Sequence, residues 1–171
     1  MVLDKHIAEI TDILKREIRS FTTVFELLIL EERSLVECDA EALAEVLQKQ
    51  EDIFSSIACL EKSRMNVLTK ISEKTGENPN IYTIPKLAEL VNGALQKELF
   101  ETGHILLRLN EDIHRKKASN AMLINQSIML VESDIRLILN AVNRKENKEA
   151  VYTSQADSNS ISGSVCIDER M

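Results

Sequence analysis

Apolar residues recur at intervals of three and four along most of the chain, with charged residues between them. This spacing places the apolar residues on one side of an α-helix and predicts amphipathic helices rather than strands. The pattern predicts long helices over residues 3–37, 39–75 and 94–143, and a short helix over 84–92. Because turn-forming residues separate these stretches, the sequence predicts an all-α fold, an elongated antiparallel hairpin or bundle of three long helices plus one short helix.

Residues with strong capping or turn preferences mark the ends of these predicted helices. Asp39 offers an N-cap to the second helix directly after the first one ends. Because this connection is so short, we expect the first two helices to fold back as a hairpin that buries both apolar faces. Thr75–Gly76 is a stop signal for the second helix, Pro85 lies at the start of the short helix, and Asn92–Gly93 ends it.

The periodic pattern stops after Asn143. Residues 151–171 hold Ser, Asn, Gln, Thr, Asp and Gly with only scattered apolar residues, too few to offset the entropy lost on ordering. The sequence therefore predicts a helical domain over residues 1–143 and a flexible C-terminal tail over residues 144–171, disordered from residue 151 onward.

Composition and charge narrow the range of functions. The chain of 171 residues has a formal net charge of −7, which repels nucleic-acid phosphates, so we expect no nucleic-acid partner. Charges interrupt every apolar run well before the roughly 20 residues of a membrane span, and no signal-peptide core is found. We therefore expect a cytoplasmic protein without stable membrane insertion. The cysteines, Cys38, Cys59 and Cys166, lack C-x-x-C spacing and are expected to be reduced and inert.

The strongest enzymatic signal is a pair of Glu-x-x-His motifs, which di-iron helix bundles use to hold their metals. Here the motifs are Glu101 with His104 and Glu111 with His114. Both lie on one predicted helix, about 15 Å apart along its axis, so they cannot share a metal pair. The sequence also contains neither a Gly-x-Ser-x-Gly motif nor a glycine-rich phosphate loop. We expect no catalytic residues, no metal and no cofactor.

Residues 121–142 carry apolar side chains on more than one side of the predicted last helix. One seam consists of Ile124, Ile128, Val131, Ile135 and Ile138. A second seam consists of Leu123, Leu130 and Leu137, seven residues apart, with Met122 and Met129 beside it. We expect the first seam to pack on the hairpin and the second to bind a partner helix. The alternative is a fully buried central helix whose seams are both part of the core.

Two segments resemble the FlgN family of flagellar export chaperones. The first runs from Leu27 to Leu35 (LLILEERSL) and is followed by Asp39, Leu43, Leu47, Leu60 and Arg64. The second runs from Ser119 to Ser127 (SNAMLINQS) and is followed by an apolar helix and then by Val151-Tyr152-Thr153.

This resemblance implies a chaperone that binds the helical terminal segments of flagellar hook-associated (hook–filament junction) proteins. It implies that the chaperone prevents their premature association and delivers them to the export gate. Client binding would lie in the C-terminal region, and Tyr152 in the tail would dock on the cytoplasmic domain of the gate. The alternative function is a structural or adaptor coiled coil, in which the last helix self-associates to form a homodimer.

Overall fold

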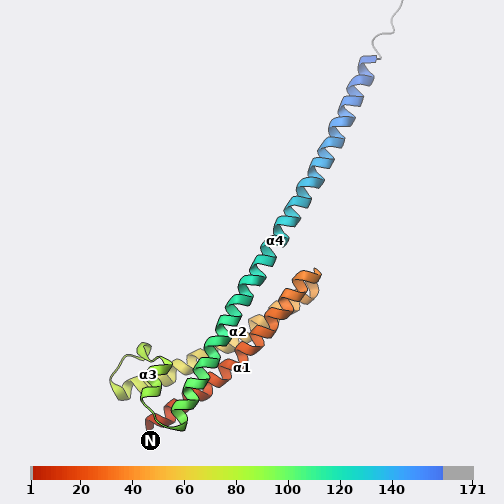
Figure 1. The fold of residues 1–171 in the computed structure, drawn as a ribbon. Coiled ribbons are helices and arrows are strands. Elements are labelled where there is room, and N and C mark those ends of the chain that lie inside the picture. The colour runs from red at the N-terminus through yellow and green to blue at the C-terminus, as the bar shows by residue number, and fades with distance from the viewer. Residues whose placement is uncertain (1, 160–171) are drawn as a thin grey trace, which may run out of the picture. The chain divides into compact units, whose positions relative to one another are not determined.

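A computed structural model describes the backbone of residues 2–159 and the side chains of residues 3–142 (Figure 1). The elements are α1 (Val2–Glu37), α2 (Ala40–Thr75), the 3-10 turn η1 (Pro79–Ile81), α3 (Ile84–Glu89) and α4 (Ala94–Asn159). The chain divides into two units, Met1–Ile124 and Asn125–Met171. The predicted all-α fold of three long helices and one short helix is confirmed.

The helices α1 and α2 form an antiparallel hairpin, as the short connection predicted (Figure 1). Two polar pairs cross the hairpin at different heights. The Arg64 Nε donates to the Glu17 carboxylate at 3.0 Å, and the Gln50 side-chain amide donates to the Glu31 carboxylate at 2.7 Å. Glu17 and Glu31 are both buried, so each pair gives a hydrogen-bond partner to a group that would otherwise destabilise the interior.

The turn between α1 and α2 is closed by a Schellman arrangement. The N–H of Asp39 donates to the carbonyl of Ser34 at 3.0 Å, and the N–H of Cys38 donates to the carbonyl of Leu35 at 3.4 Å. This geometry gives Cys38 a φ of 55°, in the left-handed region that favours glycine. Asp39 then caps α2 by accepting from the N–H of Ala42 at 3.0 Å.

The remaining helix ends follow the sequence signals closely. Gly76 has a φ of 74° and ends α2, and Gly93 has a φ of 72° between α3 and α4. Thr83 is the N-cap of α3 and accepts from the N–H of Lys86 at 3.4 Å. The turn η1, capped by Asn78, was not predicted because it is only three residues long.

Within the first unit, α4 runs in the same direction as α1. Lys15 Nζ contacts the Glu98 carboxylate at 2.5 Å, and Lys116 pairs with Glu32 farther along both helices. The hydrogen bond to Glu98 raises the pKa of Lys15 above its ordinary value of 10.5. The contact between α1 and α4 therefore favours the charged form of Lys15. These pairs fix the register in which the apolar side of α4 meets the hairpin.

Two apolar clusters form the core of the first unit. The larger cluster lies around the N-terminal half of α1 and has as its buried members Ile7, Ile10, Ile13, Leu14, Leu60, Val67, Leu68, Ile71, Tyr82, Leu87, Ala88, Val91 and Leu99. The smaller cluster has Val24, Leu28 and Ile113 at its centre. Both clusters combine residues of the hairpin with residues of α4, so the hairpin alone does not supply the core.

The last helix is longer than the sequence pattern predicted. We expected it to end near residue 143, whereas α4 continues to Asn159. The apolar periodicity stops at that point, but Lys, Glu and Ala have high intrinsic helix propensity and dominate residues 145–150. The predicted tail is therefore helical in its backbone up to residue 159, and its remainder lies outside the described residues.

Candidate functional site

The second half of α4 carries a continuous apolar seam that faces solvent. The isoleucine–valine seam consists of Ile124, Ile128, Val131, Ile135, Ile138 and Val142, spaced alternately by four and three residues. Its side chains are between 38% and 62% exposed. Apart from Ile124 the seam belongs to the second unit, so its packing on the hairpin and the alternative of a fully buried central helix both stay predictions.

The two helices of the hairpin are much shorter than α4. α1 and α2 have 36 residues each, whereas α4 has 66. In the first unit Lys116 already pairs with Glu32, so the last residue of α1, Glu37, lies level with about residue 121 of α4. Periodicity showed that a side of α4 is apolar, but the length of the hairpin decides how much of that side it can cover.

The second predicted seam is exposed as well. The leucine seam consists of Leu123, Leu130 and Leu137, with Met122 and Met129 beside it. Leu130, Leu137 and Met129 are each about two thirds exposed, at 67%, 65% and 69%, and Met122 is also exposed, while Leu123 is half-buried. Large exposed apolar patches on a single helix are typical of interaction surfaces. Met122, Met129, Leu130 and Leu137 are thus exposed, and the role of the predicted client-binding residues stays a prediction.

A polar residue is the last buried one among the side chains of α4 that the structure describes, which end at residue 142. Asn120 is only 2% exposed, and its Nδ2 donates to the backbone carbonyl of Leu28 on α1 at 2.9 Å. Its Oδ1 has no hydrogen-bond partner. Burying the Oδ1 without a partner weakens the contact between α4 and α1. The hydrogen bond of the Nδ2 favours the one alignment of α4 along α1 in which it can form. Downstream of it the exposed seams begin.

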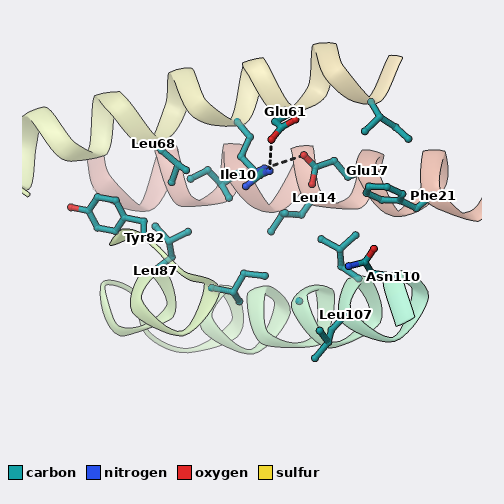
Figure 2. Close-up of a pocket in the computed structure, with 15 residues that line it drawn as sticks. Ile10, Leu14, Glu17, Phe21, Glu61, Leu68, Tyr82, Leu87, Leu107 and Asn110 are labelled. Atoms are coloured by element: carbon teal, nitrogen blue, oxygen red, sulfur yellow. Dashed lines mark hydrogen bonds and ion pairs between the residues drawn. The ribbon is translucent and has the colours of Figure 1, made fainter. Parts of the chain in front are cut away.

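The first unit contains a cavity of about 380 Å³ that the residue pattern did not predict (Figure 2). Its walls come from α1, α2, α3 and the start of α4, and include Leu14, Phe21, Leu68, Leu87 and Leu107. The volume is in the range of sites that hold a small ligand or a bulky apolar side chain.

One wall of this cavity is charged. Arg64 donates to the buried carboxylate of Glu17 and lies 4.0 Å from Glu61, as the dashed lines in Figure 2 show. Gly103 lies in the opposite wall, where a Cβ would come within 2.8 Å of Cδ1 of Ile84. Gly103 lies inside the apolar stripe of a predicted helix. A glycine at such a position was the one sign in the sequence that another segment approaches the helix backbone closely here.

The residues with catalytic potential are not brought together. Glu101, His104, Glu111 and His114 are all exposed on α4. Within the part of the chain that the structure describes, no three His, Cys, Asp or Glu side chains are arranged to hold a metal ion. Cys38 and Cys59 are exposed, and Cys166 lies outside the described residues. No helix among the described residues is long and apolar enough to cross a membrane.

A family model with the description FlgN protein matches residues 1–160, which is nearly the whole chain. The chain belongs to the FlgN family. This is the family of flagellar export chaperones, so the resemblance noted in the sequence is confirmed. Neither a curated protein nor a solved structure matches the chain.

Because FlgN proteins are chaperones, the surfaces of this chain that can bind proteins are the ones relevant to its function. In this FlgN chain the largest uncovered apolar surface among the described residues is on α4. Tyr152, the predicted gate-docking residue, belongs to the helical backbone of α4, but its side chain lies outside the described residues. The predicted contact of Tyr152 with the export gate therefore remains a prediction.

Proposed function

We propose that this chain binds the helical terminal segments of flagellar hook-associated proteins through the second half of α4. In this proposal it works in the cytoplasm, keeps the junction proteins from associating too early, and delivers them to the export gate. Tyr152 and the residues around it would contact the cytoplasmic domain of the gate. No nucleotide, metal or other cofactor is required for any of these steps.

The observation that carries the proposal is the exposure of both apolar seams of α4. Burying the exposed parts of Met129, Leu130 and Leu137 would stabilise a complex by about 1–2 kcal/mol for each side chain. Ordering a client segment on binding costs about 2–5 kcal/mol, which offsets part of this gain. The balance favours moderate affinity, which suits a chaperone that must release its client at the gate.

The test replaces Leu130 and Leu137 with Asp in one variant. Two unpaired carboxylates in an apolar contact are expected to abolish binding of a hook-associated protein in a pull-down and in calorimetry. Because both leucines are exposed, the helix content and melting temperature should stay those of the wild type. A matched control is Ile105→Asp, since Ile105 is 53% exposed in the first half of α4. Wild-type affinity in the double variant would refute the proposed surface.

A structural or adaptor role is the second candidate function. The alternate four-and-three spacing of β-branched residues in the isoleucine–valine seam is typical of coiled-coil interfaces between identical chains. Light scattering separates the two functions. An adaptor would form a tight homodimer that does not bind hook-associated proteins. A chaperone would bind these proteins through the two seams.

A further inference from the structure

The cavity in the first unit has a buried end and an open rim (Figure 2). At the buried end lie Leu14, Leu68 and Leu87, each of which is 3% or 4% exposed. At the rim lie Leu107, which is 57% exposed, and the exposed Asn110. A group from outside can therefore enter at the rim and be covered by apolar walls at the other end.

The cavity is larger than a single side chain needs. An apolar cavity of about 150 Å³ holds one benzene ring. The cavity here measures about 380 Å³, so it has room for two large side chains. Side chains three or four positions apart lie on one face of a helix, and one helical segment of a partner can therefore supply both.

The wall of the cavity contains a buried carboxylate with an unused oxygen. Glu17 is 3% exposed, and its Oε1 accepts from the Nε of Arg64 at 3.0 Å. Within the described part of the chain its Oε2 accepts no hydrogen bond, and in Figure 2 this oxygen points away from the dashed ion pair. Buried polar atoms are normally hydrogen-bonded, and an ionised carboxylate can accept at both oxygens. Oε2 of Glu17 is therefore an acceptor that a bound group can use.

The ionised side chains that line the cavity leave an excess of negative charge. Glu17 and Glu61 are acidic and Arg64 is basic, so the formal charge of the lining is −1. Arg64 donates to Glu17 and lies 4.0 Å from Glu61, so two carboxylates share one positive charge. Charges interact more strongly in a partly dry cavity than in water. Charge complementarity therefore favours a cationic group over an anionic or a neutral one.

We propose that this cavity anchors a client protein through a lysine or arginine side chain whose cationic end binds Oε2 of Glu17. This inference rests on the proposed function and adds a contact in the first unit to the seams of α4. The aliphatic stem of the basic residue packs on Leu14 and Leu106, because lysine and arginine bury their stems against apolar surface. An apolar client residue one helical turn away fills the end beside Leu68 and Leu87.

The first test narrows the entrance of the cavity. Leu107→Trp places a larger side chain at the rim, and because Leu107 is 57% exposed the core should stay intact. Calorimetric titration with a full-length hook-associated protein from the same organism should then show binding weakened at least about tenfold. Ile105→Trp is the matched control, since Ile105 is 53% exposed on the same helix and does not line the cavity. This control should bind as the wild type does.

The second test removes negative charge from the cavity. Glu17→Gln keeps the size of the side chain and should weaken binding of the hook-associated protein about tenfold. Glu61→Gln changes an exposed residue, so its folding is not at risk, and it should weaken binding about threefold. Glu45→Gln makes the same change in net charge on α2 outside the cavity and should have no effect. Circular dichroism checks that each variant keeps the helix content of the wild type.

The third test examines the chemistry of the site without the client. Hexylamine has an aliphatic chain and an ammonium group like those of a lysine side chain. It should bind the wild type more tightly than hexanol does, and hexanoate should bind most weakly. Hexylamine should also compete with the hook-associated protein. Glu17→Gln should abolish the preference for hexylamine over hexanol, because the carboxylate that distinguishes them is then gone.

Three results would overturn the anchor and leave the proposed function intact. One is a folded Leu107→Trp variant that binds the hook-associated protein like the wild type. Another is wild-type affinity in Glu61→Gln together with wild-type affinity in Glu17→Gln or failure of Glu17→Gln to fold. The third is hexylamine that binds in the cavity without competing, since a free amine would then be the occupant. A wild-type chain that binds no hook-associated protein refutes the proposed function itself, and the anchor with it.

Discussion

The substitution Cys38→Gly is expected to stabilise the protein. Cys38 joins α1 to α2 with a φ of 55°, a conformation in which a Cβ crowds the following carbonyl oxygen. The equivalent position after α2 is Gly76, with a φ of 74° and the same role at the helix end. The Cys38 thiol is exposed, so its removal sacrifices little packing.

The magnitude follows from two opposing terms. Relief of the left-handed strain is worth about 1–2 kcal/mol. Glycine has more conformational freedom in the unfolded chain and loses more entropy on folding, which lowers the gain in stability by about 0.5–1 kcal/mol. The net gain in the free energy of unfolding is therefore about 1 kcal/mol, which corresponds to a rise of about 3 °C in melting temperature for a unit of this size.

Urea unfolding followed by circular dichroism, under reducing conditions, measures the effect. Cys38→Ala is the matched control, because it removes the thiol but keeps the Cβ, and it should leave the unfolding free energy nearly unchanged. Cys59→Gly is the opposite control, since Cys59 lies inside α2 and glycine there should cost about 0.3 kcal/mol relative to cysteine. If Cys38→Gly is no more stable than Cys38→Ala, strain at this turn is not what limits stability.

Three further substitutions test the packing of the first unit. Arg64→Met leaves the buried carboxylate of Glu17 without its partner and should lower the unfolding free energy by about 3 kcal/mol, most of which Glu17→Gln should restore in the double variant. Gly103→Ala should destabilise the wild type through its contact with Ile84, but should stabilise an Ile84→Ala background by about 1 kcal/mol in a double-mutant cycle. Lys15 has a raised pKa in the folded state, so its contribution to stability is complete below pH 10.5 and is lost as the pH rises through the folded value. Urea midpoints between pH 9 and pH 12 should therefore fall more steeply for the wild type than for Lys15→Met.

The sequence by itself determined the helices and most of their ends. Period-3.6 spacing identifies an amphipathic helix because side chains three and four positions apart share a face. Asp39, Gly76 and Gly93 end or begin helices through local backbone preferences that need no tertiary context. The hairpin followed from the same information, since a short connection leaves two long apolar faces only one way to bury each other.

Residue spacing could not identify the functional surface, because an apolar stripe does not show which partner covers it. The isoleucine–valine seam has the pattern of a core stripe, yet its side chains are between 38% and 62% exposed in the second half of α4. Burial depends on the relative lengths and register of helices that are distant in sequence, and pairs such as Glu32–Lys116 set that register. The cavity beside Gly103 likewise arises only when residues of α1, α2, α3 and α4 come together, and the Glu17–Arg64 pair forms only when α1 packs on α2. Local periodicity therefore determined which residues could pack against a neighbour, and the tertiary structure decided which apolar side chains of the first unit are buried.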